Sequence, residues 1–196
     1  MKKIIIIPGL GDNVQRIQRW TKSWPNKYGL APIFHSMHWR DEEYFEFKLH
    51  QLLGLIDVIY AEGHEISIIG CSAGGSAALN ALLKRPGKVE RAINVCGRLR
   101  RGRQKGFRSF ESRTRSSKSF AQSVDFFEQH EESLSDEERK RVMTVRPLFG
   151  DELVPADTVS LSGACNIVIP SIEHVFSIYA ALTIFSSRLC RFLKDG

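Results

Sequence analysis

Cysteine is scarce in this sequence, and the few that occur stand far apart. The four are Cys71, Cys96, Cys165 and Cys190. No two of them form a CxxC pair, and no group of cysteines and histidines has the spacing of a zinc site. A disulfide framework like that of small secreted domains is therefore not expected. We predict reduced, mostly buried thiols and no bound metal.

Long hydrophobic runs are also missing. The longest charge-free apolar stretch, 175–187, contains serines and a threonine, and it is shorter than the roughly 20 residues that a membrane span needs. The amino-terminal "MKKIIIIPG" has an apolar run of only four isoleucines, ended by Pro8, which is too short for the core of a signal peptide. We therefore expect a cytoplasmic protein without a transmembrane segment.

No internal repeat or low-complexity region interrupts the chain. Its 196 residues, of which 42% are hydrophobic and 26% charged, suit a single domain (1–196) with a substantial core. What the sequence does contain is an alternation of two patterns. Short continuous apolar runs, typical of strands buried on both faces, occur in "KKIIIIPG", "APIFHS", "EISIIG", "RAINVC", "RVMTVRPLF" and "CNIVIP". Segments with apolar residues three and four positions apart, typical of helices, are 13–27, 43–60, 73–84 and 176–193. This order predicts an α/β fold with a doubly wound, mostly parallel sheet of about six strands and helices on both faces.

One segment, 98–135, departs from this alternation. Residues 98–118 contain nine Lys or Arg and one acid, a local charge of +8, while the whole chain carries +6, so the remainder is slightly acidic. The following "DFFEQHEESLSDEE" has seven carboxylates and no Lys or Arg. Ser135 and Glu138 have the spacing of a capping box, which predicts a short helix there. We expect a lid-like insert at the carboxyl edge of the sheet.

The stretch "GCSAG" matches the pattern G-x-S-x-G. Its serine, Ser72, lies between a predicted strand and a predicted helix, which is the context in which this pattern forms a sharp turn that exposes the hydroxyl. Small residues at the flanking positions let the turn and the helix approach the sheet. The pattern alone occurs often by chance, and the strand, turn and helix around it make it more specific.

A serine hydroxyl becomes a good nucleophile only when a base removes its proton and a carboxylate orients that base. Asp151 follows one predicted strand in "VRPLFGDELVP", and His174 follows the next in "CNIVIPSIEH". The order Ser72, Asp151, His174 is the order expected for a strand-turn-helix nucleophile. Two nearby acids, Glu152 and Asp157, are alternatives to Asp151, and His174 could instead be a surface histidine.

On "GCSAG", "FGDELVP" and "SIEH" together, the chain resembles a small α/β-hydrolase along nearly its whole length. The resemblance implies Ser72 as nucleophile, His174 as general base and then acid, and Asp151 as the orienting carboxylate, with no cofactor. It also implies an oxyanion hole made by the backbone N–H groups of Ala73 and of a residue in "PGLGD". Leu10 is the expected donor in that loop and Gly11 the next choice.

Two features depart from the family pattern. Pro8 and Gly9 stand where His-Gly is common, which leaves the shape of the oxyanion loop open. The sequence also begins directly at the first strand of the motif, which predicts a minimal form of the fold. His35, and beside it His38, follow a predicted strand and are expected to be structural or next to the substrate.

The resulting hypothesis is a serine hydrolase that cleaves a small-molecule carboxylic ester or thioester through an acyl-enzyme. The alternative is a catalytically weak, hydrolase-like binding protein that contacts an anionic partner through the arginine-rich insert. Three interpretations of that insert stay open: ion pairing with the acidic run that follows it, attraction of an anionic substrate or membrane surface, and attachment to nucleic acid, which is the least favoured.

Overall fold

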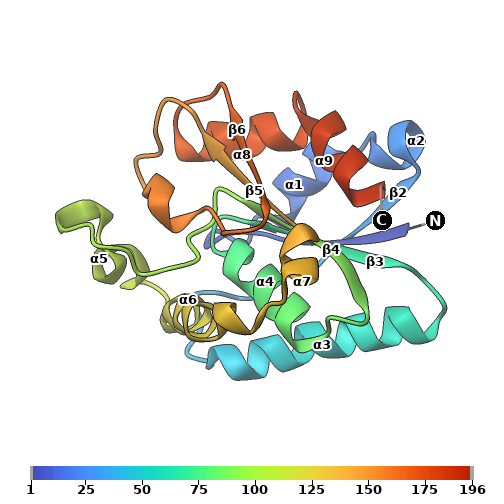
Figure 1. Cartoon of the computed structure of the whole chain (residues 1–196), viewed down its shortest axis with the longest axis horizontal. Coiled ribbons are helices and arrows are strands. Elements are labelled where there is room, and N and C mark those ends of the chain that lie inside the picture. Colours follow the sequence, from blue (N-terminus) through green and yellow to red (C-terminus); the bar gives the residue numbers. More distant parts are fainter. Residues whose placement is uncertain (1, 195–196) are drawn as a thin grey trace.

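The computed structural model describes residues 2–194 and is built around one sheet of parallel strands (Figure 1). The strands are β1 (Lys2–Ile7), β2 (Leu30–Phe34), β3 (Ile66–Cys71), β4 (Val89–Val95), β5 (Val142–Pro147) and β6 (Cys165–Ile169). Their order across the sheet is β2-β1-β3-β4-β5-β6, and every neighbouring pair is parallel. The predicted fold class is confirmed, including the six strands.

The isoleucines of β1 show why the strand sequences are continuously apolar. In the centre of the strand, Ile5 is paired with Ile33 on one side and Ile68 on the other. Ile5 and Ile7 belong to a core cluster on one face of the sheet, while Ile4 and Ile6 belong to a cluster on the other. Because successive side chains point to opposite faces, a strand covered on both sides needs apolar residues at every position.

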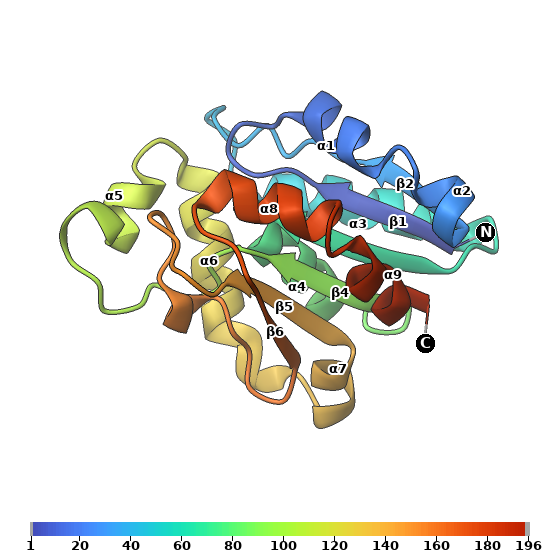
Figure 2. The ribbon, with the colours of Figure 1, turned by 90° about the horizontal axis from the view of Figure 1, so that it is seen from above.

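Helices cover both faces of the sheet, as Figures 1 and 2 show. The helices are α1 (Val14–Thr21), α2 (Trp24–Tyr28), α3 (Phe45–Ala61), α4 (Gly74–Lys84), α5 (Phe110–Thr114), α6 (Lys118–His130), α7 (Asp136–Lys140), α8 (His174–Leu182) and α9 (Ser186–Lys194). Buried side chains of α3, α4 and α6 complete one core cluster, and those of α1, α8 and α9 complete the other. The chain therefore forms a three-layer sandwich.

Two helices predicted as single segments are each divided in two. The segment 13–27 breaks before α2, where Pro25 lies in the first turn and cannot donate a helical N–H bond to the preceding turn. The segment 176–193 breaks after α8, where the hydroxyl of Thr183 donates to the carbonyl of Tyr179 and the N–H of Phe185 reaches back to Ala180. The break turns α9 so that Leu189 and Leu193 enter the core. Periodicity alone does not reveal such breaks, because both halves keep the same spacing.

The insert between β4 and β5 is made of short helices. Besides α5, α6 and α7 it contains the 3₁₀ turns η1 (Gly106–Arg108) and η2 (Glu131–Ser133). Ser135 and Glu138 form the predicted capping box at the start of α7. In both views α5 projects beyond the carboxyl ends of the strands (Figures 1 and 2).

Within residues 2–194, no single helix is long and apolar enough to cross a membrane. Helices α8 and α9 pass that test only as a pair, and they are bent by 57° at their break.

Candidate active site

Ser72 occupies the turn between β3 and α4, at the carboxyl edge of the sheet. Its φ of +54° lies in the left-handed region that residues other than glycine seldom adopt. A Cβ at Gly70 would lie 2.0 Å from the carbonyl oxygen of Gly74, and one at Gly74 would lie 2.3 Å from that of Ile7. Both glycines of "GCSAG" are therefore required by close backbone approach, and the strained turn holds the Ser72 hydroxyl at the sheet edge.

The predicted partners of Ser72 lie next to it. Nε2 of His174 is 2.7 Å from Oγ of Ser72, and Nδ1 of His174 is 2.7 Å from Oδ2 of Asp151. An ionised carboxylate can only accept, so Nδ1 carries the proton and Nε2 is free to accept a hydrogen bond from the Ser72 hydroxyl. The three side chains form one hydrogen-bonded chain in which the imidazole is oriented as a base toward Ser72.

Asp151 is held in place from its other side as well. Its Oδ1 accepts hydrogen bonds from the backbone N–H groups of Leu153 and Val154, both at 2.8 Å. Burial favours the neutral acid, but the hydrogen bond and the charge interaction with His174 and the two backbone donors outweigh it, so the pKa of Asp151 lies below its ordinary value. Asp151 is thus an anion at neutral pH, although it is only 6% exposed.

The two alternative acids have other contacts. Glu152 accepts a hydrogen bond from the backbone N–H of His174 at 3.0 Å, and so fixes the main chain at that residue rather than the imidazole. Asp157 is exposed in the 3₁₀ turn η3 (Ala156–Thr158). His174 is buried as the first residue of α8, rather than exposed in a loop before a helix starting at Phe176. Its N-cap, Glu173, receives N–H bonds from Val175 and Phe176.

The sequence did not reveal that the basic insert reaches the Asp151 loop. The guanidinium of Arg98, only 1% exposed, donates to the backbone carbonyls of Arg101 at 3.0 Å and Arg108 at 2.7 Å. Arg108 in turn donates to the backbone carbonyl of Asp151. These bonds join the beginning of the insert to the segment that carries the carboxylate. A charge run gives no signal for such a role, because the bonds go to main-chain oxygens.

The loop "PGLGD" after β1 lies against the nucleophile. A Cβ at Gly9 would lie 2.7 Å from Cβ of Ser72, so this position is restricted to glycine by the approach of the serine. Asp12 fixes the loop by accepting N–H bonds from Met37 (3.2 Å) and Trp39 (2.8 Å), and the Trp39 indole donates to the carbonyl of Pro8 at 3.0 Å. No sequence pattern indicates the supporting roles of Asp12 and Trp39, since their partners lie 25 to 31 residues away and are main-chain atoms.

The expected oxyanion donors are the N–H groups of Leu10 and Ala73. Within the described part of the chain, neither N–H donates a hydrogen bond to another protein group. Gly11 is exposed and borders, with Leu10, a cavity of about 320 Å³ that is also lined by Asp12, His38, Arg40 and Asp41. An open space therefore adjoins one of the two expected donors.

Among the described residues, His35 and the four cysteines form no hydrogen bond with the side chains of Ser72, His174 or Asp151. The backbone N–H of His35 donates to the carbonyl of Ile6, and burial together with neighbouring His38 holds the pKa of its imidazole below the ordinary value. Cys71, beside the nucleophile, is buried, and burial raises the pKa of its thiol to about 12. Across residues 2–194, no three His, Cys, Asp or Glu side chains are grouped as a metal site.

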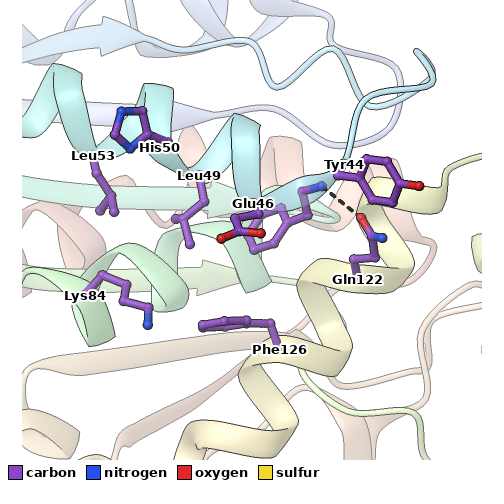
Figure 3. Close-up of a pocket in the computed structure, with 9 residues that line it drawn as sticks. Tyr44, Glu46, Leu49, His50, Leu53, Lys84, Gln122 and Phe126 are labelled. Carbon is purple, nitrogen blue, oxygen red and sulfur yellow. Dashed lines mark hydrogen bonds between the residues drawn. The ribbon is translucent and has the colours of Figure 1, made fainter.

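A larger cavity of about 470 Å³ lies away from Ser72, along α3, α4 and α6 (Figure 3). Leu49, His50 and Leu53 of α3 border it on one side, Lys84 and Phe126 on the other, and the Phe45 N–H donates to the Gln122 side chain at one end (Figure 3). The cavity contains none of the three hydrogen-bonded residues Ser72, His174 and Asp151. Its volume is therefore no argument for a reaction site there, and the hydrogen-bonded Ser72, His174 and Asp151 side chains lie at the sheet edge instead.

Comparison with known proteins agrees with the predicted α/β-hydrolase fold. A family model described as "Putative esterase" matches residues 2–145. No curated protein matches the chain. Est1E from Butyrivibrio proteoclasticus has a similar fold, with a TM-score of 0.61 and 16% identity over 95% of this chain and 87% of that one. A single-residue variant of SOBER1 from Arabidopsis thaliana has a TM-score of 0.66 and 18% identity over 98% of this chain and 100% of that one. The monoacylglycerol lipase of Paleococcus ferrophilus has a TM-score of 0.65 and 13% identity over 97% of this chain and 93% of that one. At these identities the likeness to solved structures concerns the fold, whereas the family model spans most of the sequence. The chain therefore belongs to this esterase family and is a small serine hydrolase of the α/β-hydrolase fold.

Proposed function

We propose that the protein cleaves carboxylic esters or thioesters by a Ser72-His174-Asp151 triad through an acyl-enzyme. The observation that carries the proposal is the continuous hydrogen-bonded chain from Ser72 Oγ to His174 and on to Asp151, with 2.7 Å at each link. The strained backbone at Ser72 and the buried, ionised Asp151 support the roles of nucleophile, base and orienting acid for these three residues.

In the first half of the reaction, Ser72 Oγ attacks the carbonyl carbon of the substrate while its proton passes to Nε2 of His174. The resulting imidazolium is stabilised by the carboxylate of Asp151, and the negative charge on the carbonyl oxygen is stabilised by the N–H groups of Leu10 and Ala73. The tetrahedral intermediate then expels the alcohol or thiol, which takes the proton from His174. Ser72 is left as an acyl ester.

In the second half, water attacks the acyl group while His174 accepts one of its protons. The new tetrahedral intermediate releases the carboxylic acid and returns the proton to Ser72 Oγ. Every proton and electron pair in the cycle is supplied by substrate, water or the triad, so no cofactor is required.

The open space beside Leu10 and Gly11 supports a polar group near the reacting carbonyl, because Asp12, His38, Arg40 and Asp41 also border it. Ferulic acid is bound to the structurally similar Est1E, which shows that this fold can hold an aromatic carboxylic acid in that protein. For this chain we propose a small or medium acyl group, cleaved from either an alcohol or a thiol.

The proposal is tested by labelling the purified protein with a fluorophosphonate probe, alongside Ser72→Ala and a panel of p-nitrophenyl esters and acyl thioesters of increasing length. We expect covalent labelling of the wild type, loss of labelling in Ser72→Ala, and hydrolysis of short esters. Ser76→Ala is the matched control, since Ser76 is a buried serine two positions past the motif glycine and is not part of the triad. A folded wild type that neither labels nor hydrolyses any ester or thioester would refute the proposal.

The alternative of a non-catalytic binding protein makes the opposite prediction. Its function would survive Ser72→Ala and would be lost when exposed arginines of the insert are neutralised. The hydrogen-bonded triad favours catalysis, because a protein that only binds has no need for a serine in a strained turn with an oriented base.

A further inference from the structure

Large apolar side chains are exposed along one border of the triad. Leu148, Phe149, Ile172, Val175 and Phe176 are between 42% and 65% exposed, and we refer to these five residues as the apolar rim. The two loops that carry the rim lie side by side, because the N–H of Leu148 donates to the carbonyl of Ile169 and that of Phe149 to the carbonyl of Ser171. Asp151 and His174 lie within two residues of its members.

Only two of the nine basic side chains of the insert form an ion pair with a carboxylate in the described part of the chain. Arg100 pairs with Glu131 and Arg101 with Asp125, both at 2.7 Å, so the predicted pairing with the acidic run occurs for these two. Arg98 and Arg108 are engaged with main-chain carbonyls. The other five have no ion pair with a carboxylate in the part of the chain that the structure describes, and we refer to them as the basic tip: Arg103, Lys105, Arg113, Arg115 and Lys118.

The apolar rim and the basic tip lie at the same end of the molecule. Both follow the carboxyl ends of the strands, the end from which α5 projects in Figures 1 and 2. The bond from Arg108 to the Asp151 carbonyl brings η1 against the loop that carries Phe149. Phe107 in η1 is 64% exposed and stacks with Arg113, 4.7 Å from the ring centre, and so adds an apolar side chain to the basic tip.

We propose that this end of the protein docks on an anionic lipid surface, with the apolar rim and Phe107 entering the interface and the basic tip contacting the headgroups. Exposed apolar patches of this kind mark interaction sites, and unpaired Lys and Arg beside them favour a negatively charged interface. The docked orientation turns the triad toward the lipid. Binding is independent of Ser72, so it goes beyond the proposed reaction.

The composition of the patch favours lipid over nucleic acid as the partner. Leu148, Ile172 and Val175 are aliphatic and offer no ring on which a base could stack. Aliphatic and aromatic side chains next to cationic ones instead match the two layers of a membrane interface, acyl chains below and headgroups above.

The test is co-sedimentation of Ser72→Ala protein with vesicles of phosphatidylcholine, with and without phosphatidylserine, at low and raised salt. The Ser72→Ala background prevents lipid hydrolysis, so this test and the labelling test can fail separately. We expect binding to the anionic vesicles that weakens in salt. Arg103→Gln/Lys105→Gln/Arg115→Gln should weaken it by about a hundredfold, since each charge near such a surface contributes about fivefold. Phe107→Ser/Ile172→Ser and, separately, Phe149→Ser should weaken it by about tenfold.

Matched controls lie elsewhere on the molecule. Arg188→Gln/Arg191→Gln/Lys194→Gln removes the same charge from exposed positions of α9, at the opposite end from α5 in Figure 1. Val58→Ser removes a 59% exposed apolar side chain from α3. The proposal is overturned if the wild-type sequence on the Ser72→Ala background does not bind anionic vesicles, or if the α9 control loses as much binding as the basic-tip variant. Binding that depends on the basic tip but not on Phe107, Phe149 or Ile172 would also overturn it, because the apolar side chains would then not enter the interface.

Discussion

Asp151→Asn tests the triad most sharply, because the structure determines how the new amide must lie. Oδ1 of Asp151 accepts two backbone N–H bonds, from Leu153 and Val154. In the variant this position must be the amide oxygen, since an NH₂ group there would face two donors. The NH₂ group is then directed at Nδ1 of His174, 2.7 Å away in the wild type.

The consequence is that His174 adopts the other neutral tautomer. Nδ1 must accept from the new NH₂ group, so the proton of the neutral imidazole moves to Nε2, which faces Ser72. A protonated Nε2 cannot remove the serine proton. We therefore expect kcat to fall by about 10⁴-fold, as seen for the same change in a serine protease triad, with little effect on folding because both backbone bonds are kept.

The assay is ester hydrolysis and the rate of fluorophosphonate labelling, with thermal unfolding as the check on folding. Glu152→Gln is the matched control, because the hydrogen bond that Glu152 accepts within residues 2–194 comes from the backbone N–H of His174, and we expect its kcat to change by less than about tenfold. Near-normal turnover by Asp151→Asn, or an equal loss in Glu152→Gln, would refute the assignment of the orienting acid.

Three other parts of the structure carry predictions of their own. Arg108→Gln should lower kcat by about tenfold with little change in KM, and Arg108→Lys should restore part of it, since Arg108 positions the Asp151 loop through its carbonyl; an unchanged kcat would refute this. Asp57 has a pKa well below its ordinary value because of hydrogen bonds from Arg85 and then Lys88. Its contribution to stability is therefore present above the ordinary aspartate pKa and lost as pH falls through the lowered one. Asp57→Asn should reduce the free energy of unfolding by about 1 kcal/mol or less at neutral pH, because the cluster is partly exposed, and the difference should vanish in strong acid when denaturant unfolding is followed across pH. In thiol titration of the native protein, Cys165 alone should react quickly, because the other three cysteines are buried; rapid modification of a second thiol would contradict this.

The charge of the basic insert can be read from the sequence, but the contacts of its arginines cannot. The insert's composition predicts a lid-like excursion at the carboxyl edge; in the structure α5 projects beyond that edge, whereas α6 packs into the core cluster with α3 and α4. Composition does not show that Arg98 is buried with its guanidinium on two main-chain carbonyls, or that Arg108 reaches Asp151. Any residue can supply a main-chain carbonyl, so a bond to one leaves no pattern in the sequence.

The two helix breaks also differ in whether the sequence signals them. Pro25 is a local signal, and its effect on the segment 13–27 could have been read from the sequence. The break after α8 has no such residue. There α8 and α9 bend by 57° at Thr183, and apolar side chains of both helices enter the same core cluster.

The sequence by itself determined the fold class, the six strands and the order in which serine, acid and histidine follow their strands, because each depends on local pattern and on the rule that parallel strands end at one edge. Only the tertiary structure decided which acid faces the imidazole. Asp151 and Glu152 are adjacent and chemically alike, and the choice between them depends on the direction in which one short loop presents each side chain. It also decided that Gly9, Asp12 and Trp39 support the serine, since their contacts join segments distant in the chain, and distances of that kind exist only once the chain has folded.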